Sequence, residues 1–355
     1  MDTRDLSAHT IYRAGRGIEE TARELGVDPD ELIKLSSNEN ALGPSPKAVE
    51  AIREHAEALH SYPKASHADL GEALAERWDV TPAQIWLANG GDGAMDCLAR
   101  AMIDPGQAAL VPDPDFTYHS MSVRYHHGEV HTYPLVEDDG FAQSPDRILD
   151  AYDGERMIYV TSPHNPTGSV VSLDEIEEIA ERTDDETLVV VDEAYNEFAD
   201  RPSAVELVEA RDDVAVVRTF SKVYGLAGLR LGYAITPQEW ADAYERINTP
   251  FSASEIACRA GLAALEDDEH VDAITDLVEW GREYYYEHLD AKTYETGGNF
   301  VLVEVGDASR VAQATKERGV IVRDCSSFGL PEHIRVSCGT REETKTAVET
   351  INEVL

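Results

Sequence analysis

The chain has 355 residues, enough for about two domains of ordinary size, and 42% of them are hydrophobic, so it can bury a sizeable core. Asp and Glu number 69 against 30 Lys and Arg, and the net charge of −39 is spread along the whole length. Such a chain repels nucleic acids and anionic lipid surfaces, and the even spread predicts a solvated acidic surface suited to high salt. A more specific alternative is a DNA mimic or a cation-storage protein, but the acidic residues show no repeat and no metal-loop spacing.

The N-terminal residues contain no apolar segment of the kind found in secretory signals, and no stretch approaches the roughly 18 apolar residues of a membrane span. We therefore expect a cytoplasmic protein. The four cysteines, Cys97, Cys258, Cys325 and Cys338, lie far apart without C-x-x-C spacing. This spacing predicts buried free thiols rather than a zinc site or a disulfide framework.

Short apolar runs alternate with amphipathic segments through the first two thirds of the chain. A helix is predicted over Leu173–Arg182, where Ser172 and Glu175 form a capping-box pattern, and another from about Ala94. The alternation predicts an α/β domain with a mainly parallel sheet. The runs that we expect as strands are Ile85–Ala88, Ala108–Val111, Met157–Thr161, Leu188–Val191 and Val214–Val217.

The pattern changes after Pro250, where a second, smaller α/β domain is predicted. Helix is expected from about Ser254 to Leu289, with a break near Gly281. Strands are expected at Phe300–Val305, Val320–Arg323 and His333–Ser337. The predicted division is an N-terminal arm with part of the small domain in residues 1–35, a large domain in residues 36–250 and a small C-terminal domain in residues 251–355.

Residues with useful chemistry follow four of the expected strands, and α/β sheets bind ligands at these strand ends. Asp192 and Lys222 each follow an apolar run, S-P-H-N-P-T-G occupies 162–168, and the loop N-G-G-D-G of 89–93 precedes a helix. A Gly-rich turn before a helix binds phosphate, a lysine forms a Schiff base with a carbonyl, and an aspartate holds a protonated pyridine nitrogen. Singly, each is more often a turn, a surface lysine or a helix cap, but together they fit pyridoxal phosphate.

Longer motifs carry a family resemblance. The runs S-P-H-N-P-T-G (162–168), V-D-E-A-Y (191–195) and R-T-F-S-K-V-Y-G-L-A-G-L-R-L-G-Y (218–233) resemble those of fold-type I aminotransferases, which use pyridoxal phosphate. Within these enzymes the chain is most similar to the histidinol-phosphate aminotransferase family, over roughly residues 11 to 350. The blocks that carry this second resemblance are L-S-S-N-E-N-A-L-G-P-S-P-K (35–47), Y-P-K (62–64), V-I-V-R-D (320–324) and I-R-V-S-C-G-T-R-E-E (334–343).

The resemblance implies roles for individual residues around the cofactor. Lys222 would form the Schiff base and then move the proton, Asp192 would keep the ring nitrogen protonated, and Tyr195 and Asn165 would bond the ring oxygen O3′. The cofactor phosphate would be bound by the backbone amides of Gly91 and Asp92 and by the side chains of Ser221 and Arg230. Phe116 would stack on the ring, or Tyr118 would do so if the alignment of this loop is shifted by two residues.

The resemblance also implies substrate contacts and a partner subunit. Arg323 and Arg335 match anion-binding arginines, which would serve the phosphate of histidinol phosphate and a carboxylate of glutamate in turn. Tyr12 matches a tyrosine that reaches the substrate phosphate, and Asn40 lies beside the site with no firm role. Tyr62 matches a tyrosine that reaches the neighbouring subunit's cofactor, so we expect a homodimer with shared active sites. The alternative for Arg323, Arg335 and Tyr12 is a role in surface ion pairs or packing, and the alternative for Tyr62 is an ordinary loop tyrosine.

The implied reaction is transfer of an amino group between glutamate and imidazole acetol phosphate, giving L-histidinol phosphate and 2-oxoglutarate in histidine biosynthesis. Threonine-phosphate decarboxylase and aromatic-amino-acid aminotransferase remain open on the same scaffold. A non-enzymatic binding module is a third alternative, but it would normally have lost Lys222, Asp192 or Arg230. His164 is expected to be structural, and no residue is assigned to a metal.

Overall fold

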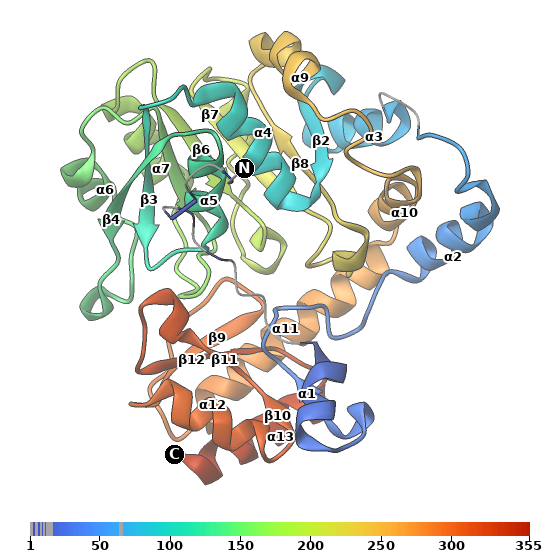
Figure 1. The fold of residues 1–355 in the computed structure, drawn as a ribbon, viewed down its shortest axis with the longest axis vertical. Coiled ribbons are helices and arrows are strands. Elements are labelled where there is room, and N and C mark those ends of the chain that lie inside the picture. Colours follow the sequence, from blue (N-terminus) through green and yellow to red (C-terminus); the bar gives the residue numbers. More distant parts are fainter. Residues whose placement is uncertain (1–2, 4–5, 8, 10, 12–16, 64–66) are drawn as a thin grey trace.

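The computed structural model describes the chain except for residues 1–2, 4–5, 8, 10, 12–16 and 64–66. Figure 1 shows a large sheet with its helices in the upper half of the molecule. A smaller sheet with the C-terminal helices lies in the lower half, and the long helix α11 (Asp268–His288) runs between the two parts. This mixed α/β architecture agrees with the fold class predicted from the sequence.

The large sheet has seven strands in the order β2-β8-β7-β6-β5-β3-β4, and within it β8 runs antiparallel to both neighbours while the other contacts are parallel. Five of its strands coincide with the five apolar runs of the sequence. The edge strand β4 is mostly exposed and β8 contains Gly232, so neither forms an obvious apolar run. The strands are β2 (Ile85–Asn89), β3 (Ala108–Asp113), β4 (Glu129–Pro134), β5 (Met157–Thr161), β6 (Leu188–Asp192), β7 (Val214–Thr219) and β8 (Leu231–Ile235).

Both faces of the large sheet are covered, which explains why its strands are almost continuously apolar. Along β6, Val189 and Val191 enter one core cluster, whereas Leu188 and Val190 enter the other, as the two-residue period of a strand requires. Helices α4 (Gly90–Met102), α5 (Tyr118–Tyr125) and α9 (Ala241–Ile247) pack on the second cluster. The first cluster holds α2 (Pro46–His55), α3 (Ala68–Trp78), α6 (Pro145–Ala151), α7 (Leu173–Arg182), α8 (Val205–Val208) and α10 (Glu255–Leu265).

The C-terminal part is built on a three-stranded antiparallel sheet of β11 (Arg323–Asp324), β12 (His333–Ser337) and β9 (Phe300–Glu304), in that order. Helices α11, α12 (Ala308–Lys316) and α13 (Arg341–Val354) pack around it. The N-terminal segment joins this part, because β1 (Ile33–Lys34) pairs in parallel with β10 (Val320–Ile321). A small apolar cluster under α1 (Ile18–Leu25) secures the contact.

The structure corrects three details of the predicted elements. The helical region after Pro250 breaks between α10 and α11 rather than near Gly281, which lies inside α11. A Cβ atom on Gly281 would lie 3.1 Å from Cys338 Cβ, so the glycine permits close packing and not a break. The strand predicted over 320–323 is two strands in different sheets, since the chain changes partners at Val322. Helix α4 begins at Gly90, four residues earlier than predicted.

The helix at Leu173–Arg182 has the predicted bounds, and its Ser172–Glu175 capping box is present. All four cysteines are buried and unpaired, as predicted. Within the described residues, no helix is long and apolar enough to cross a membrane.

Candidate active site

The carboxyl ends of the central strands open on a cavity of about 610 Å³. Residues of the large sheet and of the three-stranded sheet both contribute to its wall. The residues predicted from the sequence that line it are Gly91, Asp92, Phe116, Asn165, Asp192, Tyr195, Ser221, Lys222, Arg230, Arg323 and Arg335.

Strand order brings the key side chains to one edge of the sheet. Asn165 lies in the loop after β5, Asp192 is the last residue of β6, and Lys222 comes three residues after β7. Because β5, β6 and β7 are parallel neighbours, these three positions meet at the same edge. Asp192 is 4% exposed, and its Oδ1 accepts a hydrogen bond from the Ala194 N–H at 3.0 Å.

The start of α4 forms a cradle for an anion such as a phosphate. No side chain caps this helix at Asn89, so its first N–H groups remain free for a ligand at the positive end of the helix dipole. Gly90 has φ +73°, and a Cβ atom there would lie 2.6 Å from Nη2 of Arg230, so a side chain would displace that guanidinium. Ser221 adds a hydroxyl to the same wall. The donor set therefore fits a phosphate group.

Arg230 meets a carboxylate within this cradle. Its Nη2 lies 2.9 Å from Asp92 Oδ2. Burial raises the pKa of Asp92, and although Arg230 opposes the shift, the nearby Asp192 adds to it. An incoming phosphate would compete with Asp92 for the guanidinium.

Lys222, which also lines the cavity, is held by a residue that was not predicted. Its Nζ lies 3.3 Å from the carbonyl oxygen of Asn38 and 5.3 Å from the centre of the Tyr195 ring. Asn38 also donates through Nδ2 to the Tyr195 hydroxyl at 3.1 Å, while Asn299 Nδ2 donates to the Asn38 carbonyl at 3.1 Å. Asn38 is the first residue of the N-E-N motif that contributed to the family resemblance. Its backbone has a left-handed φ of 53°, which the sequence did not indicate.

Two arginines lie directly opposite each other on neighbouring strands at the cavity wall. Arg323 on β11 is in register with Arg335 on β12. Arg335 donates to Oδ1 of Asn165 and to the carbonyl of Ser36 at 3.0 Å. Arg323 donates to the Ser327 hydroxyl at 3.0 Å, and its buried Nε has no hydrogen-bond partner among the described residues. Like charges placed opposite each other destabilise a sheet, so this pair suits an anionic ligand.

Several predicted site residues do not line the cavity. Asn40 instead fixes a loop, since its Nδ2 donates to the Val223 carbonyl at 2.8 Å. Tyr62 is 86% exposed and stacks on Phe251 at 5.2 Å between ring centres. Tyr118, the alternative to Phe116, packs edge-on against Tyr125 and is not one of the residues that line the cavity. Tyr12 lies outside the described residues.

Two buried histidines adjoin the site. His119 Nε2 lies 3.3 Å from Asp192 Oδ2, and its Nδ1 lies 2.7 Å from Asp115 Oδ1. Neither His119 nor Asp115 was predicted, although their i,i+4 spacing was the available signal. His164 bonds Thr167 at 2.8 Å, and burial lowers its pKa to about 3, which agrees with a structural role.

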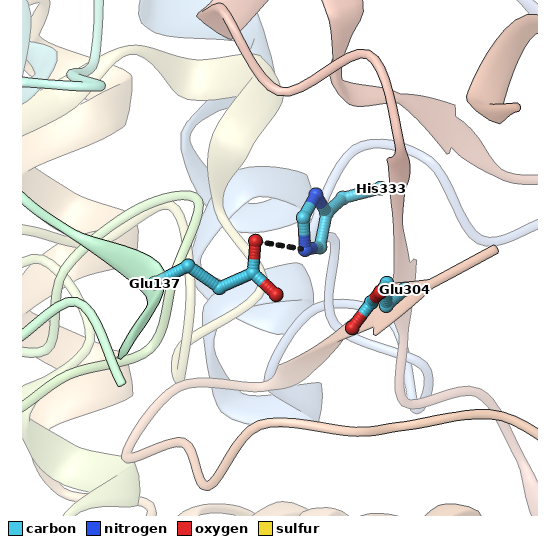
Figure 2. A group of neighbouring side chains, drawn as sticks. All are labelled: Glu137, Glu304 and His333. Carbon is cyan, nitrogen blue, oxygen red and sulfur yellow. Dashed lines mark ion pairs between the residues drawn. The ribbon is translucent and has the colours of Figure 1, made fainter. Parts of the chain in front are cut away.

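A separate group of titratable side chains joins the two halves of the molecule. Figure 2 shows Glu137, from the turn after β4, pointing toward His333 and Glu304 of the three-stranded sheet. A cation already lies among these groups, because Lys292 Nζ is 2.9 Å from Glu137 and 3.3 Å from Glu304. Hydrogen bonds from Tyr294 and Lys292 lower the pKa of Glu137 to about 2. The group is therefore an ion-pair network that a metal would have to displace.

Comparison with known proteins agrees with this geometry. The family model for aminotransferases of class I and II matches residues 30–351. The chain therefore belongs to the class I and II aminotransferases, whose fold-type I architecture it shares.

Among its relatives, the chain is 67% identical to the histidinol-phosphate aminotransferase of Haloarcula marismortui, over all of this chain and 99% of that protein. It is 66% identical to the histidinol-phosphate aminotransferase of Natronomonas pharaonis, with both chains covered completely. Among solved structures, histidinol-phosphate aminotransferase from Sinorhizobium meliloti in complex with pyridoxal-5'-phosphate matches with a TM-score of 0.87 and 27% identity, over 96% of this chain and 95% of that chain. The aspartate aminotransferase of Thermus thermophilus with maleate matches with a TM-score of 0.85 and 26% identity over the whole of both chains.

Proposed function

We propose that this chain is a pyridoxal-phosphate-dependent histidinol-phosphate aminotransferase. It moves an amino group from glutamate to imidazole acetol phosphate and yields 2-oxoglutarate and L-histidinol phosphate. The observation that carries the proposal is one cavity whose wall combines Lys222, Asp192, an open helix start and the facing pair Arg323 and Arg335. The full-length identity to relatives of that name supports it.

The residues present suit the cofactor, which when bound supplies an aldehyde to carry the amino group and a ring to take up electrons. Lys222 Nζ would be the attachment point for the aldehyde and would carry the proton removed from the substrate Cα. Asp192 would accept a hydrogen bond from the ring nitrogen, and Asn165 and Tyr195 would bond the ring oxygen. Phe116 would pack on one face of the ring.

The cradle at the start of α4 would hold the phosphate of the cofactor. The backbone N–H groups of Gly91 and Asp92, the Ser221 hydroxyl and the Arg230 guanidinium would be the donors. Arginine suits this position because its planar fork of N–H groups makes paired hydrogen bonds with phosphate oxygens.

Arg323 and Arg335 bind the anionic ends of the two substrates in turn. A substrate phosphate or carboxylate between the two guanidiniums removes their mutual repulsion and satisfies the buried Nε of Arg323. One anion site serves both half-reactions, because the amino donor leaves as a keto acid before the amino acceptor enters. Tyr12 is proposed to reach the substrate phosphate in the same place.

We further propose a homodimer in the cytoplasm. The proposed domain division is an arm with part of the small domain in residues 1–35, a large domain in residues 36–250 and a small domain in residues 251–355. Tyr62 supports the dimer, since this tyrosine, although stacked on Phe251, is 86% exposed in the single chain and therefore accessible to a neighbouring subunit. Asn40 is proposed to support the site indirectly, through the loop that follows Lys222.

A substrate panel at high salt tests the function. Protein loaded with pyridoxal phosphate is mixed with L-histidinol phosphate, O-phosphothreonine or phenylalanine, and the absorbance of the cofactor is followed. The expected result is a shift with histidinol phosphate, reversed by 2-oxoglutarate, and little change with the other two. Carbon dioxide release from phosphothreonine would establish the decarboxylase instead, and a shift with phenylalanine alone would establish the aromatic aminotransferase.

A further inference from the structure

His119 is a fully buried, titratable group that the proposed mechanism does not use. It lies in the first turn of α5 with both ring nitrogens facing carboxylates, Asp115 Oδ1 at 2.7 Å and Asp192 Oδ2 at 3.3 Å. A neutral imidazole carries one N–H and can donate to only one of the two. The charged imidazolium carries two N–H groups and donates to both.

The surroundings of His119 favour the charged form. Burial alone would lower its pKa, but attraction and hydrogen bonding from Asp115 and Asp192 outweigh this and raise the pKa to about 10. The Tyr159 ring stacks on the imidazole at 4.7 Å between ring centres. The other groups that act on it are the Phe116 ring edge at 5.7 Å and, at longer range, the charges of Asp92 and His164.

We propose that His119 and Asp115 are positioning residues for the reaction, and that Asp115 keeps His119 as an imidazolium that fixes the Asp192 carboxylate at the end of β6. The proposal rests on the proposed function, because Asp192 is the group that would meet the cofactor ring. Asp192 is then held by two donors, His119 at Oδ2 and the Ala194 N–H at Oδ1.

Asp115 is needed for its charge as well as for its shape. Its carboxyl group is buried, and Oδ2 has no hydrogen-bond partner among the described residues, so the contact with His119 is its main compensation. In Asp115→Asn, the amide oxygen still accepts from His119 Nδ1, but the charge that stabilises the imidazolium is gone. The neutral ring would then turn an unprotonated Nε2 toward Asp192, and two acceptors would face each other.

Two measurements test this, and the first needs neither cofactor nor activity. Nitrogen NMR of cofactor-free protein with labelled histidine, assigned with His119→Gln, reports whether each ring nitrogen carries a proton. We expect His119 to show two protonated nitrogens from about pH 6 to about pH 9 in the wild type. In Asp115→Asn the same ring should be neutral over most of this range. A neutral His119 at pH 7 in the wild type would overturn the proposal, even if the variants fail to fold.

The second measurement is titration of the cofactor-free protein with pyridoxal phosphate, followed by absorbance. We expect Asp115→Asn to weaken binding by about tenfold or more, as the loss of a supporting partner of a site residue commonly does. The matched control is Asp113→Asn, which removes the same charge from an exposed residue two positions away. Equal affinity of the two variants would refute the positioning role. A wild type that binds the cofactor with a charged His119 but ignores histidinol phosphate would contradict the proposed function and leave this inference intact.

Discussion

The ion pair between Arg230 and Asp92 makes a specific prediction about cofactor affinity. In the structure the guanidinium that would grip the phosphate is engaged by a carboxylate at 2.9 Å. Binding of the phosphate must therefore weaken or replace that pair. We expect Asp92→Asn to bind pyridoxal phosphate more tightly than the wild type, because the variant removes the competing charge and keeps the backbone N–H.

The size of the gain follows from the exposure of the pair. The side chains of Arg230 and Asp92 are 44% and 38% exposed, so solvent and salt screen their attraction. Pairs of this kind contribute about 0.2–1 kcal/mol. If the phosphate had to give up all of this free energy, the dissociation constant should fall by a factor of about 1.4 to 5 in the variant.

The assay is titration of cofactor-free protein with pyridoxal phosphate at a fixed high salt concentration. Asp96→Asn is the matched control, because Asp96 lies one turn further along α4 and pairs with Arg100 and His126 rather than with Arg230. The control should leave the affinity almost unchanged, since salt near 1 M limits electrostatic range to about 3 Å. Weaker binding by Asp92→Asn would refute the reasoning and show that the carboxylate helps to hold the cofactor.

Three further outcomes are expected. Borohydride reduction followed by peptide mapping should place a pyridoxyl group on Lys222, and Lys222→Ala should carry none while still binding the cofactor noncovalently. Gly232→Ala should lower the free energy of unfolding, measured by chemical denaturation, by about 1–3 kcal/mol, because its Cβ would lie 2.4 Å from the backbone of Gly90. Gly228→Ala is the control and should not lower it, since a Cβ there meets nothing within 4 Å. Arg218→Met should cost about 3–5 kcal/mol in the same assay, because it removes the arginine partner of Glu197 and one of the two arginines that pair with the buried Glu193, and a loss under 1 kcal/mol would contradict that account.

The central strands and the large features of the site could be predicted from the sequence because each depends on local pattern. The five apolar runs became strands, and the order of strands in a parallel sheet brought Asn165, Asp192 and Lys222 to one edge. The cavity wall likewise contains both predicted arginines. The strand-end positions followed from the rule that ligands bind at the carboxyl ends of such strands, whereas Arg323 and Arg335 came from the family resemblance.

The parts that could not be predicted depend on contacts between distant segments. Asn38 reaches Tyr195 across 157 positions of the chain, and His119 reaches Asp192 across 73. The unbroken helix at Gly281 and the split of the strand at Val322 have the same origin, since close packing against Cys338 and a change of sheet decided them. Apart from the i,i+4 spacing of Asp115 and His119, nothing in the local sequence distinguishes such residues from their neighbours.

An acidic protein surface can coexist with a cavity that binds anions because the two charge effects act over different distances. A net charge of −39 repels any anion at a distance, yet the proposed substrates and the cofactor are all anionic. High salt shortens electrostatic range to about 3 Å, the length of a hydrogen bond, so the long-range repulsion fades. Contacts of Arg323, Arg335 and Arg230 with a bound phosphate or carboxylate act within that distance, and Arg335, which is 5% exposed, is also protected from screening by burial. Salt therefore removes the obstacle to binding and spares the attraction that gives the site its selectivity.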